Sequence, residues 1–572
     1  MKIIYQGKEV GLQKNIKKVI DMFGDSIRIS SKHVIACKLN NEVKSLNYEI
    51  KEGDNVELLD ITSKDGIQVY IRGALFITSM AMKQLYPDAK LIVNYQLQNS
   101  MFCELLDDKA VTDEMIENLR AKINEIVEKD YPIEKKEMTK QEAEQFFKDN
   151  DIKYNDLFGK LQLENKYKNY VSEYFCNGYF NYFYGVMPLS TGYINLIDVC
   201  KYKNGFIVRY PNRSNPTEIG EFKDSKKFSA TLQEYDQIWN LMKINTVNDI
   251  NQEIRNGKSK DLVLVSEALQ EKKIAELADK ITKHRGIKIV LIAGPSSSSK
   301  TTFAKRLGVQ LRINGINPVT IGTDNYFVER PDTPRDENGN YDFETIDALD
   351  LKLFNDHLTK LINGETIEMP TFDFKLGVKK YNGHMLHLDQ DEVLIIEGIH
   401  SLNDRLTAKI PRKNKFKIYI SDLTVLNLDS YNRISTTDTR LVRRIVRDYN
   451  FRGYSALQTL ERWPSVNAGE NKNIFPFQEE ADAMFNSSLP YELCVLSKYA
   501  TPLLKKIDNS HPEYSEAKRI ISFLEYFDSI DEKYIPNNSL LREFIGGSIF
   551  DYEQLINNIG FIIKQKLYYW LL

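Results

Sequence analysis

The hydrophobic pattern divides the 572-residue chain into stretches of different period. Over residues 1–60, short runs of alternating polarity are separated by turns, one at Asn40 and Asn41 and another at Gly53 and Asp54. This pattern predicts a small half-open β-sheet module. Over residues 225–284 the apolar positions recur at helical spacing, and they predict a helical connector.

Residues 285–502 carry short continuous apolar runs separated by helical patterns. One such helix is expected to begin at Asp350, as a capping residue, and to end at Gly364. Strands that alternate with helices are typical of a doubly wound α/β fold with a parallel sheet. The runs predicted as buried strands are 289–293, 318–322, 391–397, 415–421 and 491–496.

The first of these strands leads into a motif with a chemical meaning. After Gly294 and Pro295 come four serines, then Lys300, Thr301 and Thr302, and then a helical pattern. Strand, small-residue loop, Lys-Thr and helix form the layout of a phosphate-binding P-loop, in which backbone N–H groups surround an anion. Lys300 is expected to reach the β- and γ-phosphates of ATP from an exposed loop, and the Thr301 hydroxyl to hold Mg²⁺. The ATP-binding residues predicted here are Gly294, Pro295, Ser296, Ser297, Ser298, Ser299, Lys300, Thr301 and Thr302.

One position departs from the P-loop pattern, because Ser299 stands where the pattern has glycine. A side chain there is expected to crowd the phosphates or to strain the loop. The alternative is a serine-rich turn that only caps an ordinary helix.

Acidic residues follow two of the predicted strands. Asp324 comes after 318–322, and Glu397 ends 391–397. Ligands of doubly wound sheets bind at the carboxyl ends of the strands, so an acid beside the P-loop suits a catalytic base for a substrate hydroxyl. The alternative for Asp324 is a residue that caps a turn.

Four arginines recur at helical spacing after the fourth predicted strand. Arg440, Arg443, Arg444 and Arg447 occupy positions i, i+3, i+4 and i+7 and predict one basic helix face. Such a face on a mobile lid would clamp a transferring phosphate, because guanidinium groups bind oxyanions through two hydrogen bonds. The alternative is a charged face in contact with solvent.

Composition narrows the class of protein. The chain has 77 basic and 80 acidic residues, and this small net charge argues against nucleic-acid binding over the whole protein surface. The first residues lack the apolar segment of a signal peptide, and no apolar run is long enough to span a membrane, which favours a cytoplasmic protein. The final YYWLL is interpreted as a docking tail. Five scattered cysteines are expected to be reduced: Cys37, Cys103, Cys176, Cys200 and Cys494.

Residues 288–495 resemble the uridine kinase and phosphoribulokinase group of P-loop kinases. The similarity is carried by TDNYF, DFETIDALD, MPTFDF, IIEGIHSLND and, most specifically, DTRLVRRIVRDYNFRG. The resemblance implies that Asp324 takes the proton of a nucleoside 5′-hydroxyl and that Glu344 holds the ribose. It also implies Glu397 beside Mg²⁺ with Thr301, and lid arginines that act in catalysis (Arg440, Arg444) or bind ATP (Arg443, Arg447). The substrate-binding set implied is Asp324, Tyr326, Glu344, Phe372 and Arg440.

Two positions differ from that group. Phe372 replaces a tyrosine, and Gly377 stands where the group has the histidine that reads the base. The sequence leaves the base open, with His384, His387 or His400 as the residues that could compensate.

The N-terminal half resembles two other modules. Glu52-Gly53-Asp54 with Val56-Glu57-Leu58 is similar to the end of a TGS domain, a β-grasp module, and residues 77–91, 112–147 and 188–194 are similar to the α+β second domain of threonyl-tRNA synthetases. That domain edits mischarged tRNA, and the positions of its ligands and bases are here Arg72, Phe76, Phe183 and Met187, so the resemblance implies a kept fold and lost editing. Its aromatic residues are interpreted either as core or as a surface that stacks on RNA bases.

These observations predict five regions: 1–62, 63–224, 225–284, 285–502 and a C-terminal helical cap at 503–572. We expect an ATP- and Mg²⁺-dependent nucleoside kinase that is similar to uridine and cytidine kinases. Two alternatives stay open: an RNA-associated regulator whose P-loop senses nucleotide, and a kinase for another small hydroxyl substrate such as a sugar phosphate. The partners considered are that substrate, RNA or tRNA at the N-terminal half, and a second copy of the chain.

Overall fold

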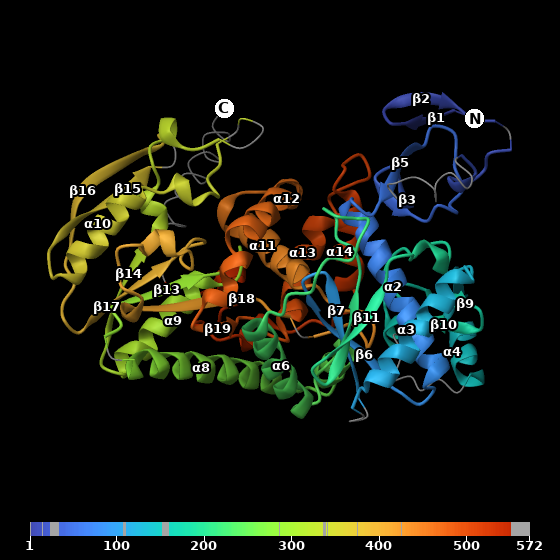
Figure 1. Cartoon of the computed structure of the whole chain (residues 1–572), viewed down its shortest axis with the longest axis horizontal. Helices are drawn as coiled ribbons and strands as arrows, with labels where there is room; N and C mark the ends of the chain where they lie inside the picture. The colour runs from blue at the N-terminus through green and yellow to red at the C-terminus, as the bar shows by residue number, and fades with distance from the viewer. Residues whose placement is uncertain are drawn as a thin grey trace.

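The computed structural model describes residues 2–13, 15–22, 34–106, 110–150, 159–284, 286–335, 339, 341–373, 376–424 and 426–550. The predicted docking tail lies outside the described residues, as does the rest of 551–572. Figure 1 shows the N-terminal strands at one end of the molecule and the hairpin β15–β16 at the other. No helix in the described ranges is long and apolar enough to cross a membrane.

A five-stranded sheet opens the chain, as the alternating pattern predicted. Its order is β2-β1-β5-β3-β4, with β1 and β5 parallel and the other pairs antiparallel. The chain turns between β3 and β4 at Asn40 and Asn41, both at positive φ. The strands are β1 (Lys2–Tyr5), β2 (Lys8–Gly11), β3 (Val34–Leu39), β4 (Glu42–Lys44) and β5 (Asn55–Asp60).

The next region is an α+β layer around one long buried helix, α2 (Lys64–Leu85). Ser63 caps α2 by accepting a hydrogen bond from the Gly66 amide. One continuous apolar core joins this helix to the first sheet and reaches from Ile3 to Tyr210. The other helices are α3 (Asp113–Glu128), α4 (Lys140–Asp149) and α5 (Gly159–Glu164). One sheet has the order β11-β12-β7-β6 and another the order β10-β9-β8. Their strands are β6 (Leu91–Leu97), β7 (Ser100–Leu105), β8 (Glu134–Thr139), β9 (Tyr170–Cys176), β10 (Tyr179–Asn181), β11 (Asp198–Tyr202) and β12 (Gly205–Arg209).

Residues 225–284, predicted as a helical connector, contain the helices α6 (Lys226–Leu241), α7 (Val247–Arg255) and α8 (Ser259–Lys283). The longest of them, α8, runs along the flank of the P-loop region beside α9 (Lys300–Ile313) (Figure 1). A buried arginine of α9, Arg306, pairs with Glu267 and Glu271 of α8. The connector is therefore bonded to the helix that follows the P-loop.

The region after the connector contains a parallel sheet with the order β14-β17-β13-β18-β19 and helices on both faces. Every residue of the central strand, β13, is buried, because separate apolar clusters cover its two faces. The strands are β13 (Ile289–Ala293), β14 (Asn317–Gly322), β17 (Glu392–Glu397), β18 (Lys415–Ser421) and β19 (Ala483–Asn486). The helices are α9, α10 (Leu351–Ile362), α11 (Thr436–Arg452), α12 (Ala456–Asn473) and α13 (Glu492–Leu504). The predicted doubly wound fold is thus confirmed.

The prediction of the fifth strand was wrong. Residues 491–496 lie at the start of α13, and the fifth strand is β19, at Ala483–Asn486. A short apolar run cannot be told from a buried helix by its period. The first turns of α13 are buried on all sides, which accounts for the continuous apolar run.

Two further pieces complete the described chain. The hairpin β15 (Ile367–Asp373) and β16 (Val378–Leu386) projects beside the sheet (Figure 1). The described part of the predicted C-terminal cap contains α14 (Tyr514–Leu524) and α15 (Arg542–Ile545). The residues of α15 pack against α11, next to the P-loop.

Candidate active site

Three predicted site segments meet at the carboxyl edge of the parallel sheet. Gly294 follows β13, Asp324 lies in the 3₁₀ turn Thr323–Tyr326 after β14, and Glu397 ends β17 between them. Glu397 pairs in register with Ile292 of β13 and with Gly322 of β14. The neighbouring positions of these strand ends explain why the predicted phosphate loop and the predicted acids belong to one site.

The lysine of the P-loop bonds to the backbone of its own loop. The Lys300 ammonium donates to the carbonyl oxygens of Gly294 and Pro295 at 2.9 and 3.0 Å. Lys300 is half-buried, so the expectation of an exposed loop was wrong. Burial lowers the pKa of Lys300, while the charge of Glu397 acts in the opposite direction.

The strain expected at Ser299 is present. Ser299 adopts φ +66° and Ser297 φ +62°, a conformation that costs a residue with a side chain on the order of 1–2 kcal/mol. The hydroxyls of Ser297, Ser298 and Ser299 are buried and have no hydrogen-bond partner among the described residues. Buried polar groups usually have partners, so these hydroxyls fit a site that a ligand with several acceptor oxygens completes.

A hydroxyl and a carboxylate meet at the start of α9. The Thr301 hydroxyl donates to the Glu397 carboxylate, with O–O distances of 3.0 and 3.1 Å. Burial raises the pKa of Glu397 to about 7, while Lys300 and the Thr301 hydrogen bond act to lower it. Oxygen donors of this kind are what Mg²⁺ prefers, and the positive field of a cation would keep Glu397 ionised.

The two acids predicted to contact the acceptor substrate are both exposed. The Asp324 side chain reaches solvent, yet the surrounding protein desolvates its carboxyl and raises its pKa; Lys300 and Arg452 oppose that shift. Glu344 lies against Gly469, since a Cβ placed on that glycine would come within 3.2 Å of the Glu344 Cγ. Desolvation also raises the pKa of Glu344, and Arg444 opposes it.

The predicted arginine face does not point into solvent. Arg440, Arg443 and Arg447 are buried, and α11 packs with these side chains against the P-loop and its acidic neighbours. Arg440 donates to the carbonyl oxygen of Ser296 at 3.1 Å, and Arg443 to that of Ser297 at 3.3 Å. The helical period had identified one face correctly, but it could not tell a solvated face from one buried against a loop.

Each buried arginine has a carboxylate partner. Arg440 pairs with Glu470, Arg443 with Glu492 and Asp422, and Arg447 with Asp448. Arg444 is half-buried and donates to the Ser296 hydroxyl at 2.7 Å, besides its pair with Asp448. Of the four, Arg444 is therefore the least buried, and the ligand contacts predicted for all four stay predictions.

Two predicted substrate residues do not present polar groups to the site. Tyr326 is buried, and its hydroxyl lies 3.1 Å from Nδ1 of His357. Phe372 is also buried, with its ring 5.6 Å from that of Phe327. Both side chains are packed against neighbouring residues in this structure, and the substrate contacts predicted for them stay predictions.

The departure at Gly377 has a steric cause. Gly377 adopts φ +71°, and a Cβ there would lie 2.6 Å from the Cβ of Arg330. A histidine at this position would have to displace Arg330. Of the three histidines that could compensate, His384 and His387 are exposed on or after β16, and His400 is buried, which lowers its pKa to about 4.

The sequence did not identify three acidic residues around the P-loop and its arginines. Asp422 directly follows β18, so its place at the carboxyl edge of the sheet was a usable signal. Glu470 lies inside α12 and Glu543 inside α15, and no local pattern marks either one. Glu470 accepts a hydrogen bond from the Ser296 amide at 2.7 Å, and Glu543 accepts one from the Thr302 hydroxyl at 2.6 Å.

The editing-like region has a packed interior. Phe76, Phe183 and Met187 are buried, and the rings of Phe76 and Phe183 lie 5.7 Å apart. The Arg72 guanidinium donates to the carbonyl oxygen of Val186 at 2.9 Å. Among the described residues no group of three or more histidine, cysteine, aspartate or glutamate side chains could hold a metal ion.

A loop of the kinase-like region docks on this interior. The segment 426–433 follows β18, and Tyr431 packs at 6.1 Å from the ring of Phe183. Asn432 donates to the carbonyl oxygen of Tyr182 at 3.1 Å and accepts from the Tyr184 amide at 2.7 Å. The core interpretation therefore holds for Tyr182 and Phe183, which are buried under the chain's own loop.

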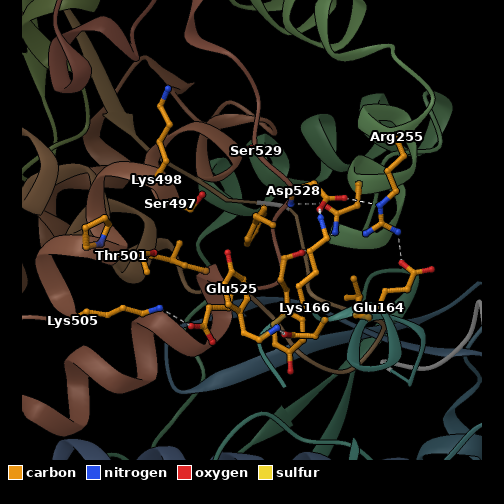
Figure 2. Close-up of a pocket in the computed structure, with 18 residues that line it drawn as sticks. Glu164, Lys166, Arg255, Ser497, Lys498, Thr501, Lys505, Glu525, Asp528 and Ser529 are labelled. Carbon is orange, nitrogen blue, oxygen red and sulfur yellow. Dashed lines mark hydrogen bonds and ion pairs between the residues drawn. The ribbon is translucent and has the colours of Figure 1, made fainter. Parts of the chain in front are cut away.

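A separate cavity of about 430 Å³ lies away from the P-loop, and Figure 2 shows its lining. It opens between residues 161–167, α7, the end of α13 and the segment 524–529. Each of its cationic side chains already faces a carboxylate. The pairs are Lys166–Asp528, Arg255–Glu164, Arg255–Asp528, Lys498–Glu532 and Lys505–Glu525. The charges of the lining are therefore paired, and they favour neither an anionic nor a cationic ligand.

The strand, loop and helix of residues 289–313, with Lys300 and Thr301 at the carboxyl edge of a parallel sheet, define a P-loop site. Residues 289–492 match the phosphoribulokinase / uridine kinase family. The resemblance to that kinase family is thereby confirmed for this segment of the chain.

Individual relatives match two different parts of the chain. The uridine kinase of Bacillus subtilis (strain 168) is 28% identical over 195 residues, 34% of this chain and 83% of that protein. The threonine–tRNA ligase of Clostridium kluyveri is 28% identical over 148 residues, 26% of this chain and 23% of the ligase. This chain thus spans about a quarter of the ligase. A solved structure of a "possible uridine kinase" from Bacillus stearothermophilus covers 38% of this chain and 98% of its own, with 19% identity and a TM-score of 0.26.

Proposed function

We propose that the protein is a kinase that transfers a phosphoryl group from ATP, with Mg²⁺, to the 5′-hydroxyl of a nucleoside. The observation that carries the proposal is the meeting of Lys300, the Thr301–Glu397 pair and Asp324 at neighbouring strand ends. The match to the phosphoribulokinase / uridine kinase family supports the reaction class.

The P-loop residues would hold the phosphates of ATP. The orphaned hydroxyls of Ser297, Ser298 and Ser299 suit phosphate oxygens, and Lys300 adds a positive charge. Thr301 and Glu397 would hold Mg²⁺ through oxygen ligands. Bound ATP supplies the phosphoryl group, and the metal ion neutralises charge on the phosphates.

Asp324 would take the proton from the acceptor hydroxyl. Its exposed carboxyl is accessible to a substrate, and its raised pKa brings it closer to the pH at which the enzyme works. Lys300 and Arg444 would stabilise the charge that develops on the transferring group. In this class of reaction, positioning and charge stabilisation supply most of the rate enhancement.

The nucleoside as acceptor is supported by two exposed side chains that neighbour each other in the chain, Phe343 and Glu344. Glu344 is an exposed carboxylate that can accept hydrogen bonds from two ribose hydroxyls. Phe343 is 37% exposed and lies 6.0 Å from the rings of both Phe327 and Tyr341, so its exposed surface can stack on a base. A sugar phosphate has no planar base to stack there.

The test is an acceptor panel with ATP and Mg²⁺, comprising the common ribo- and deoxyribonucleosides and several sugar phosphates. We expect phosphorylation of one or more nucleosides at the 5′ position, with uridine and cytidine first. Turnover of sugar phosphates alone would overturn the choice of acceptor. No turnover of any acceptor, together with tight ATP binding, would favour a nucleotide sensor.

A second function, contact with tRNA or another RNA, rests on the match of the N-terminal half to threonine–tRNA ligases. The docked loop 426–433 covers Tyr182 and Phe183, so the aromatic residues available for stacking are fewer than the sequence suggested. Filter binding of labelled total tRNA to the full chain at several salt concentrations tests this function. Binding no tighter than to a random RNA of equal length would reject it.

A further inference from the structure

The end of the described chain reaches the P-loop helix. Glu543 of α15 accepts a hydrogen bond from the Thr302 hydroxyl at 2.6 Å, and both side chains are buried. Thr302 is the third residue of α9, directly after Lys300 and Thr301. A residue 241 positions away in the sequence therefore contacts the first turn of the phosphate-binding helix.

Phe544, the residue after Glu543, contacts α11, the helix that carries the four arginines. The Arg443 guanidinium lies over the ring of Phe544, 5.3 Å from its centroid, and the Phe544 carbonyl oxygen accepts from the Asn450 side chain at 3.0 Å. Arg443 in turn donates to the carbonyl oxygen of Ser297. Two successive residues of α15 thus act on the P-loop, one through α9 and the other through α11.

The segment that carries these residues is anchored in two cores. Leu540 is fully buried in the core under the parallel sheet, and Phe544 in the core around α11 and α13. The Ser539 hydroxyl donates to Glu267 of α8 at 2.5 Å, and Arg542 donates to the carbonyl oxygen of Ile535 at 2.7 Å. These contacts fix the place of the Glu543 side chain, because both of its flanks are packed.

The negative charge of Glu543 is compensated by nearby cations. Its carboxylate lies within electrostatic reach of Lys300, Arg443 and Arg452, three of the cations around the P-loop. A buried carboxylate requires such compensation together with a hydrogen-bond donor, and Thr302 provides the donor.

We propose that Glu543 is a positioning residue of the nucleotide site, which holds Thr302 and the first turn of α9 in the geometry that binds phosphates. The proposal rests on the proposed function, since it assigns the P-loop to ATP. It extends the kinase site beyond the segment that matches the kinase family, which ends at residue 492. The kinase core then depends on the C-terminal cap.

The test measures ATP binding, with Mg²⁺, by titration calorimetry on the full chain and four variants: Glu543→Ala, Glu543→Gln, Thr302→Val and the double variant Glu543→Ala/Thr302→Val. We expect Glu543→Ala and Thr302→Val each to raise the Kd for ATP about tenfold, the scale of one lost buried hydrogen bond. Glu543→Gln keeps an acceptor oxygen and should stay within about threefold of the wild type. The double variant should be no weaker than the weaker single one, because both remove the same contact.

Three controls separate this role from general damage. Glu525→Gln changes a carboxylate of the same cap that pairs with Lys505, and it should leave ATP binding unchanged. Thr302→Val preserves shape and removes the same hydrogen bond, so it replaces Glu543→Ala in the test if Glu543→Ala does not fold. In turnover assays, Glu543→Ala should raise the KM for ATP more than it lowers kcat.

Some outcomes would overturn the proposal. One is a Glu543→Ala variant whose Kd for ATP equals that of the wild type. Another is a double variant whose rise in Kd is the product of the two single rises. A third is a Glu543→Gln variant that binds ATP as weakly as Glu543→Ala. A wild type that binds no ATP would instead reject the proposed function itself.

Discussion

The Arg440 guanidinium and the Glu470 carboxylate form a two-bond ion pair, with N–O distances of 2.7 and 2.9 Å. Both side chains are almost fully buried, and Glu470 also accepts from the Ser296 amide at 2.7 Å. The pair therefore joins α11 and α12 to the P-loop backbone. Because charge is buried here, its loss should affect both the stability and the shape of the loop.

Glu470→Ala leaves the Arg440 charge buried without its main partner. Breaking one side of such a pair typically costs about 3–5 kcal/mol in the free energy of unfolding, measured by urea denaturation. Arg440→Lys should also destabilise, since an ammonium cannot make both hydrogen bonds. Asp347→Ala is the matched control: it breaks the exposed pair with Arg405 and should cost less than about 1 kcal/mol. Equal costs for the buried and the exposed pair would contradict the assignment.

Lys300→Ala should abolish most phosphoryl transfer while the protein stays folded. Among the described residues its ammonium donates to the loop carbonyls of Gly294 and Pro295 alone, so little packing depends on it. Loss of one electrostatic contact to the transferring phosphate costs on the order of 10² to 10³ in kcat. The measurement is kcat on the best acceptor, with circular dichroism as a check of folding. The exposed Lys283→Ala should retain full activity; near-full activity of Lys300→Ala would reject the P-loop assignment.

The sequence predicted the parts of the fold that depend on local pattern. The strand before Gly294, the Asp350 cap of α10 and the turn at Asn40–Asn41 are each determined by residues close together in the chain. It also placed Asp324 and Glu397 correctly at strand ends, because parallel topology brings successive strand ends to one edge.

Partners from distant parts of the chain could not be predicted in this way. The four arginines share one helix face, but whether that face meets water or Glu470 and Glu492 depends on tertiary packing. Glu543 reaches Thr302 only because α15 docks on α11 and α9. The strand predicted at 491–496 failed for the same reason, since burial on all sides gives a helix the apolar run of a strand.

A buried glutamate in the N-terminal half makes stability depend on pH. Burial, with a smaller effect of Asp429, raises the pKa of Glu173 to about 8. The folded state therefore binds this proton more tightly than the unfolded state, whose value is 4.5. The stabilisation is complete below pH 4.5 and is lost as the pH rises toward 8.

Glu173→Gln should remove this dependence, because the amide stays neutral in both states. At pH 7 to 8 we expect the variant to be more stable than the wild type by about 3–4 kcal/mol. Urea unfolding between pH 5 and 8 measures the difference, which should shrink to less than about 1 kcal/mol at pH 5. Glu137→Gln, on the exposed strand β8, should show no such effect. A variant that is less stable than the wild type at pH 8 would contradict the burial argument.

The full chain should not deacylate mischarged seryl-tRNA. At the four positions of the editing ligands and bases stand Arg72, Phe76, Phe183 and Met187, and none offers a base or metal ligand to a substrate. The measurement is release of serine from charged tRNA above the spontaneous rate. Hydrolysis above the spontaneous rate by repurified wild type would reject the prediction.

Asp324 separates an enzyme from a nucleotide sensor. If it is the base, Asp324→Asn keeps the shape and the hydrogen bonding of the side chain but removes the proton acceptor, and turnover should fall by about 10² or more. ATP should still bind, because Lys300, Thr301 and the P-loop backbone are unchanged. The raised pKa adds a second expectation: the acid limb of kcat/KM should lie above the ordinary aspartate value of 3.8, since activity is lost as the base gains its proton. Glu344→Gln is the control, because it should raise the KM for the acceptor while leaving that limb in place. Equal turnover by wild type and Asp324→Asn on a good acceptor would remove Asp324 from the mechanism, and with it the main reason to prefer a kinase over a sensor.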